Sequence, residues 1–138
     1  MFMHRIEVYE LRQIGRKIFY DVSTGDVLVN TGEKVGNVIE TTLEQDIQSY
    51  SILTERTRHS FDVLDLPFGA YSQDFAECND IRINPNTKAI EFSYPDPTNP
   101  EAPSVFQKPL SVEVEELKIA QAATDTTLLE LMETILLA

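Results

Sequence analysis

The sequence has very little cysteine and histidine, and this limits the chemistry that it can support. It contains one cysteine, Cys78, so no disulfide can form within the chain. It contains two histidines, and the usual zinc, phosphate-loop and serine-hydrolase motifs are absent. A chain so poor in thiols fits a reducing compartment. We therefore expect a protein that is not an enzyme and that holds neither a cofactor nor a metal.

Positive charge and long apolar runs are also scarce. Lysine and arginine number 11 against 23 aspartates and glutamates, which gives a formal net charge of −12 at pH 7. Binding to nucleic acid or to an anionic membrane surface needs clustered basic residues, so we expect neither partner. No stretch approaches the roughly 18 apolar residues of a membrane-spanning helix. Residues Met1 to Arg5 lack the apolar core of a secretory signal.

Alternating apolar residues and turn residues predict a β-rich first part. A weak alternation from Arg5 to Leu11 predicts one strand. Two further pairs of strands are predicted on either side of turns: Lys17–Val22 with Val27–Thr31, and Ile81–Ile83 with Ile90–Tyr94. The turn around Ser23–Asp26 contains a glycine that can take positive φ, and the second turn is Asn84–Lys88. The two turns look alike, either because a hairpin was duplicated or because both use the same turn chemistry.

Helical signals are fewer in this part of the chain. Thr41 followed by Glu44 predicts a capping box, and the apolar spacing over Leu43–Tyr50 predicts one short helix. Phe61–Leu64 predicts a strand, and Gln73–Cys78 a helical turn. Together these signals predict an α+β fold: a head with a small antiparallel sheet or sandwich built from hairpins, one short helix, and a long C-terminal helix.

The prolines divide the chain into three parts. Residues 1–94 form the predicted head, residues 95–110 a proline-rich connector, and residues 111–138 the terminal helix. The connector holds five of the seven prolines: Pro95, Pro97, Pro100, Pro103 and Pro109. Such a composition favours an extended, polyproline-like path that leads the helix away from the head. Val105 and Phe106 are the residues expected to fix this path on the head.

The terminal helix is predicted from a stretch without proline or glycine, with Ser111 as its N-cap. Eight positions, which we call the heptad seam, alternate in steps of four and three: Leu110, Val114, Leu117, Gln121, Thr124, Leu128, Leu131 and Ile135. This spacing is typical of a coiled coil, with Gln121 and Thr124 as a polar layer. Two interpretations stay open: the helix packs on its own head, or it pairs with a partner's helix. A break at Thr124–Thr127 is a third.

Other candidate sites are weaker. Three aromatic residues close together in a predicted loop are either core residues or a patch for a partner: Phe68, Tyr71 and Phe75. Four oxygen-bearing residues could surround Ca²⁺, although their spacing fits no EF-hand and a solvated acidic loop is favoured: Asp74, Glu77, Asn79 and Asp80. His59, Asp62 and Cys78 could form a nucleophilic system. The acidic surroundings would raise the pKa of Cys78, which argues against that interpretation.

Three motifs between Leu66 and Leu117 carry a family resemblance: GAYSQDF, CNDIRINPNTKAIEFSYPDP and QKPLSVEVEEL. With them, the chain resembles small proteins encoded in the tail module of phages (siphoviruses) and prophages of Gram-positive bacteria, of the Bacillus type. The opening hairpin, Tyr20 to Glu33, is similar to theirs as well. The matching residues are Gly69, Tyr71, Asp74, Phe75, Cys78, Asn79, Arg82, Asn84, Pro85, Thr87, Glu91–Pro95 and Lys108–Ser111.

The resemblance implies a structural or adaptor protein in the tail or baseplate region of a virion, made in the host cytoplasm. Its expected partners are other phage tail proteins or further copies of itself, and a trimer is favoured over a dimer because tail organelles are ring-symmetric. No catalytic residue comes with the resemblance. The alternative is a phage-encoded binding module that acts on a host protein in the infected cell.

Overall fold

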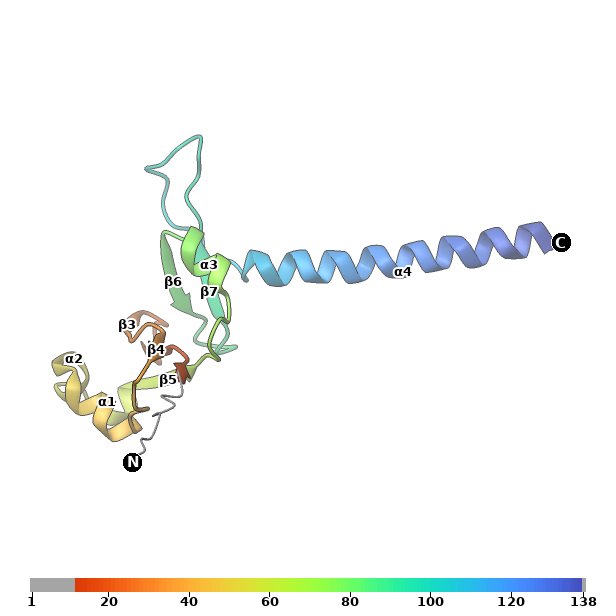
Figure 1. Cartoon of the computed structure of the whole chain (residues 1–138). Coiled ribbons are helices and arrows are strands. Elements are labelled where there is room, and N and C mark those ends of the chain that lie inside the picture. The colour runs from red at the N-terminus through yellow and green to blue at the C-terminus, as the bar shows by residue number, and fades with distance from the viewer. Residues whose placement is uncertain (1–11, 138) are drawn as a thin grey trace, which may run out of the picture.

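The computed structural model describes residues 12–137 and has an α+β fold, as predicted (Figure 1). The strand expected over residues 5–11 lies outside the described residues. Within them the strands pair antiparallel in three sheets: β1 (Arg12–Ile14) with β4 (Lys34–Gly36); β2 (Lys17–Asp21) between β3 (Val27–Asn30) and β5 (Phe61–Asp65); and β6 (Asp80–Ile83) with β7 (Ile90–Ser93). The helices are α1 (Leu43–Ser49), α2 (Ser51–Thr54), α3 (Ser72–Glu77), α4 (Leu110–Leu137) and the 3₁₀ turn η1 (Arg58–Ser60).

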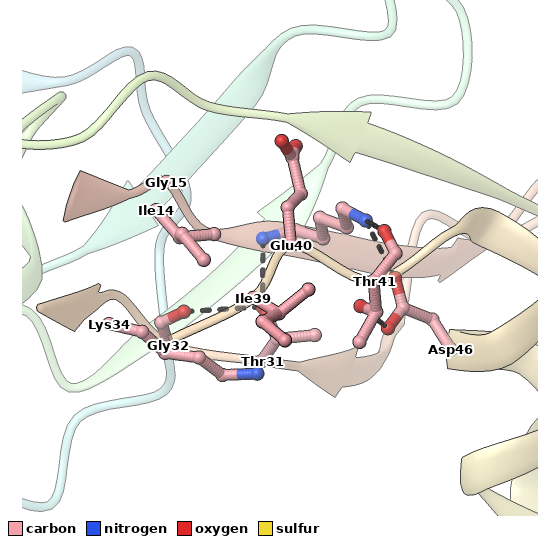
Figure 2. A pocket seen from close by; sticks show the side chains of 10 residues that line it. Ile14, Gly15, Thr31, Gly32, Lys34, Ile39, Glu40, Thr41 and Asp46 are labelled. Atoms are coloured by element: carbon pink, nitrogen blue, oxygen red, sulfur yellow. Dashed lines mark hydrogen bonds and ion pairs between the residues drawn. The ribbon is translucent and has the colours of Figure 1, made fainter. Parts of the chain in front are cut away.

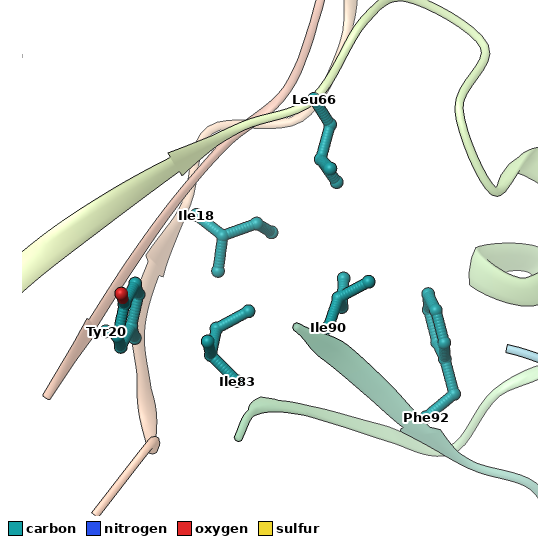
Figure 3. Packing of buried hydrophobic residues seen from close by; sticks show 6 residues of the cluster. All are labelled: Ile18, Tyr20, Leu66, Ile83, Ile90 and Phe92. Carbon is teal, nitrogen blue, oxygen red and sulfur yellow. The ribbon is translucent and has the colours of Figure 1, made fainter. Parts of the chain in front are cut away.

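Strand β2 is the centre of the head because it is buried on both faces. Successive side chains of a strand point to opposite faces, so Ile18 and Tyr20 face one side and Phe19 the other. Ile18 and Tyr20 join a cluster with residues of β6 and β7 (Figure 3). Phe19 packs with Leu53 of α2 and with Phe61, whose ring lies edge-on at 6.3 Å. The head therefore has helices α1 and α2 on one face of the central sheet and the second hairpin on the other.

The first predicted hairpin, β2–β3, turns on hydrogen bonds made by its own side chains. The Asp21 carboxylate accepts hydrogen bonds from the backbone N–H groups of Ser23 (2.8 Å) and Thr24 (3.2 Å). Gly25 takes φ of 81°, a conformation that glycine reaches without a steric penalty. The guanidinium of Arg56 reaches the same carboxylate at 2.8 Å and ties the segment that follows α2 to the turn.

The second predicted hairpin, β6–β7, repeats this turn. The Asn84 side chain accepts from the N–H groups of Asn86 (2.9 Å) and Thr87 (3.2 Å). Lys88, with φ of 61°, occupies the place that Gly25 has in the first turn. The likeness seen in the sequence is thus a shared hydrogen-bond pattern, which identical turn chemistry is sufficient to produce.

The first turn also docks on the second hairpin. The Ile83 N–H donates to the Gly25 carbonyl at 2.9 Å, and Asp26 forms an antiparallel bridge with Arg82. A Cβ at Gly25 would lie 1.8 Å from the Ile83 carbonyl oxygen, so the close approach requires glycine. This contact joins the two hairpins into one head.

The short helices differ in detail from the prediction. Thr42, not Thr41, is the N-cap of α1, and Gln45 rather than Glu44 completes the capping box. Thr41 is used elsewhere, since its hydroxyl donates to the carboxylate of Asp46. The predicted single short helix is α1; α2 and η1 are additional. The predicted strand at Phe61 and the helical turn near Gln73 are confirmed as β5 and α3.

Candidate functional site

The proline-rich connector does not lead away from the head, contrary to the prediction. It leaves β7, makes an exposed loop and returns to the same strand (Figure 1). There, Phe92 and Gln107 exchange two backbone hydrogen bonds, of 2.9 and 3.0 Å. Phe106 is half-buried beneath the Arg82 guanidinium, at 4.8 Å, whereas Val105 is exposed. The pairing of Gln107 with Phe92 brings the connector back to the head despite its prolines. Helix α4 therefore starts at the edge of the head.

Helix α4 begins at Leu110, and its first free N–H groups are satisfied by the head. The N–H of Leu110 donates to the Tyr94 hydroxyl at 3.0 Å, and the N–H of Ser111 donates to Asp74 Oδ1 at 3.2 Å. The Tyr94 hydroxyl itself donates to Asp74 Oδ1 at 2.7 Å. A helix leaves such N–H groups without internal partners, so outside acceptors stabilise its start. We call Asp74, Tyr94 and Ser111 the anchor.

The predicted role of Ser111 as N-cap is wrong. Ser111 is the second residue of α4, so Pro109 occupies the N-cap position. The Pro109 carbonyl accepts hydrogen bonds from the backbone N–H groups of Val112 and Glu113. Proline has no side-chain acceptor, so the cap comes from another element. The Ser111 hydroxyl instead donates to Asp74 Oδ2 and completes the anchor.

The anchor carries a buried negative charge at the positive end of a helix dipole. Asp74 is 2% exposed. Burial alone would raise its pKa, but the hydrogen bonds from Ser111 and Tyr94 outweigh burial and hold the pKa of Asp74 below its usual range. Burial, together with the nearby Asp74 carboxylate, raises the pKa of Tyr94 to about 12. Asp74 is thus an ionised acceptor near neutral pH, and Tyr94 is a neutral donor.

Beyond its first turn, α4 has no cover from the head. Figure 1 shows the helix running straight away from α3 and β7, and every residue from Val114 to Leu137 is exposed. An ion pair between Lys108 and Glu116, at 3.0 Å, is a further link near its start. In this structure the helix does not pack along its own head, so that interpretation is set aside.

The helix is also continuous, and the break considered at Thr124–Thr127 does not occur. Three threonine hydroxyls in this stretch each donate to the carbonyl four residues earlier at 3.0 Å: those of Thr124, Thr126 and Thr127. Gln121 donates to Asp125 at 2.9 Å. Each of the three hydroxyls shares a carbonyl with the helix backbone, and the helix stays continuous through all of them.

All eight residues of the heptad seam lie on α4, and they form an uncovered stripe. On a straight helix, such a stripe rotates around the helix axis by about 20° per heptad. When two helices supercoil, the stripe stays facing the partner helix. Apolar residues also lie off the seam. Leu117 on the seam and Ile119 away from it are both 63% exposed, and Leu128 and Leu129 are 52% and 60% exposed. Seam and off-seam residues are therefore similarly exposed in the monomer, which makes them matched pairs for experiment.

The predicted aromatic patch is divided. Tyr71 and Phe75 pack against Phe92, with ring centres 6.0 and 5.0 Å away, and belong to the core. Phe68 is 37% exposed and is not part of that cluster. Two of the three residues therefore hold α3 on the second hairpin rather than meeting a partner.

The other candidate sites do not assemble. No group of three or more metal-binding side chains forms within residues 12–137, and Asp74 of the proposed calcium set belongs to the anchor. Burial raises the pKa of the Cys78 thiol, which donates to the Phe75 carbonyl. The hydrogen bonds of the described chain do not connect it with His59 or Asp62.

One small hollow in the head is closed by an ion pair (Figure 2). Lys17 Nζ lies 2.7 Å from Asp46 Oδ2 and donates to the Thr41 carbonyl at 3.1 Å. The volume that remains is about 10 Å³, roughly enough for one water molecule. The ion pair holds α1 on the sheet, and the hollow has no room for a ligand larger than water.

Comparison with known proteins adds no relative: no family model, no curated protein and no solved structure matches the chain. Among the residues that the structure describes, no helix has the length and hydrophobicity needed to cross a membrane. The uncovered helix α4, fixed to the head by the anchor, is therefore the strongest candidate for a functional element.

Proposed function

We propose that this protein is a non-enzymatic structural or adaptor protein of a phage tail or baseplate region, and that it docks or oligomerises through α4. The observation that carries the docking role is the exposure of the helix. It has 28 residues, is about 42 Å long, and carries solvent-exposed apolar side chains along its length. An isolated helix is marginal in water, so a partner that covers α4 would supply stability that the monomer lacks.

The anchor supports this role because it fixes the direction of α4. A flexible tail would lose conformational entropy on docking, whereas a helix already formed and held at its base loses less. The assignment to a phage tail rests on the sequence resemblance between Leu66 and Leu117. That stretch includes Asp74, Tyr94 and Ser111, the three residues of the anchor.

Particle composition tests the proposal. The wild-type protein should be present in purified particles of the encoding phage at a fixed ratio to other tail proteins, measured by quantitative mass spectrometry. The double variant Leu117→Asp, Leu128→Asp should be lost from particles, because charges would enter the covered face. The matched control Ile119→Asp, Leu129→Asp should still be incorporated, since the four residues are similarly exposed in the monomer.

Two results would count against the proposal. A wild-type protein abundant in the lysate but absent from particles would exclude a tail role and favour action on a host protein. Equal incorporation of the two double variants would show that docking does not use the heptad seam.

A further inference from the structure

We propose that the partner of α4 is a second copy of the same chain, and that the two helices lie parallel and in register in a coiled coil. This inference rests on the proposed function of α4 as a docking helix and names its occupant. It is carried by the positions of the few charged residues that flank the heptad seam.

Charge is distributed unevenly around α4. The helix contains six acidic residues and a single lysine, Lys118. With Val114 and Leu117 as the a and d positions, Glu113 is a g position and Lys118 is the e position of the next heptad. In a parallel, in-register coiled coil, a g residue faces the e residue five places later on the partner helix, and such pairs set orientation. Glu113 of one chain would thus face Lys118 of the other, in both directions.

Both charges are available for such a pair. Neither Glu113 nor Lys118 takes part in any ion pair among residues 12–137, whereas Glu116 is already paired with Lys108 at 3.0 Å. The two residues are five apart on one helix and so do not face each other within a chain. Glu113 and Lys118 can therefore pair with each other only between chains.

The polar layer agrees with this alignment. In register, Gln121 meets Gln121 of the second copy and Thr124 meets Thr124, so polar residues face polar residues and apolar residues face apolar ones. An antiparallel pairing would also match polar residues, Gln121 against Thr124, so the charges decide between the two. It would place Lys118 against Asp125, which already accepts a hydrogen bond from Gln121 at 2.9 Å. Among residues 12–137, Glu113 and Lys118 take part in no ion pair, and their pairing therefore favours the parallel arrangement.

A charge exchange in the full-length protein tests the pairing. Light scattering and sedimentation should show more than one chain per particle in the wild type. Lys118→Glu or Glu113→Lys alone should raise the dissociation constant about tenfold at low salt, because each makes like charges face one another. The double variant Glu113→Lys, Lys118→Glu should restore the wild-type value. Glu133→Lys, which makes the same charge change away from the interface and out of reach of both residues, is the matched control.

Cross-linking tests the orientation. In a Cys78→Ala background, Ile135→Cys should form a covalent dimer when oxidised glutathione is added, since a positions lie opposite each other. In a full-overlap antiparallel pair, the two introduced thiols would be about 35 Å apart and could not join. Glu133→Cys, which points away from the seam, should stay uncoupled. Circular dichroism confirms that each variant keeps its helix and head.

The inference is overturned if the full-length protein is a monomer at all concentrations, if the double exchange fails to restore association, or if the Ile135→Cys variant does not couple. These failures are distinct from failure of the proposed function. A monomeric protein that still enters particles through the heptad seam would keep the docking role and assign it to a different partner.

Discussion

Asp74 is the residue on which the attachment of α4 depends most. It accepts hydrogen bonds from Tyr94 and from both the backbone and the hydroxyl of Ser111, and it lies at the positive end of the helix. Without it, the Tyr94 hydroxyl and the N–H of Ser111 would lose their acceptor in a part-buried place. The anchor therefore links three segments that are far apart in the sequence.

Removing this carboxylate should destabilise the protein measurably. Asp74→Ala should lower the free energy of unfolding by about 2–4 kcal/mol, because a cap and a charged hydrogen-bond acceptor are lost together. Urea unfolding followed by circular dichroism measures the change. Glu77→Ala, on the exposed side of the same short helix, is the control and should change stability by less than about 0.5 kcal/mol. Equal effects of the two would show that the anchor contributes nothing.

The role of Asp74 could be predicted only in part. Tyr71, Asp74, Phe75 and Cys78 follow the spacing of one helix face, which puts a carboxylate among apolar residues and implies a buried acceptor. The donors could not be found, because Ser111 is 37 residues away and nothing local specifies which donor it meets. The sequence instead favoured a solvated acidic loop around Asp74, with calcium binding as the weaker alternative, and a local cap for Ser111.

Among the elements, the two hairpins were the most predictable because their turns are specified by adjacent residues. Asp21 and Asn84 each satisfy their own turn, so short-range chemistry is sufficient. The pairing of β1 with β4 was not predicted, since three-residue strands carry too little alternation. The return of the connector to Phe92 was also missed. A single pair of backbone hydrogen bonds at Gln107 has no side-chain signature.

The contact between the hairpins depends on Gly25. Gly25→Ala should lower the free energy of unfolding by about 3 kcal/mol or more, because the Cβ would meet the Ile83 carbonyl at 1.8 Å and φ is 81°. Gly32→Ala is the matched control: φ is 72° but nothing lies within 4 Å, so the cost should be about 1 kcal/mol of backbone strain. Urea unfolding compares them. Similar losses would mean that the hairpins can move apart at little cost.

On the scale of the whole molecule, acid should weaken the fold at two places at once. Burial would raise the pKa of Asp46, but bonds from Lys17 and Thr41 hold it below its usual range, as Ser111 and Tyr94 do for Asp74. The unfolded chain then takes up protons first. Both contributions are complete above the ordinary pKa of 3.8 and are lost as pH falls through it toward the folded values.

Unfolding measured between pH 7 and pH 2.5 checks this expectation. Each carboxylate should add a slope of at most about 1.4 kcal/mol per pH unit below pH 4. The double variant Asp46→Asn, Asp74→Asn should be less stable at pH 7 and should show a smaller loss on acidification. A variant as acid-sensitive as the wild type would assign the effect to other carboxylates.

The attachment of α4 at one end makes it a lever. The anchor lies within the first turn, and the helix extends about 42 Å from its base, so a tilt of about 10° there moves the far end by about 7 Å. Displacements too small to disturb the core around Phe92 would thus become shifts larger than a side chain at Leu137. For a partner that binds the tip, the hydrogen bonds of the anchor set a direction in space.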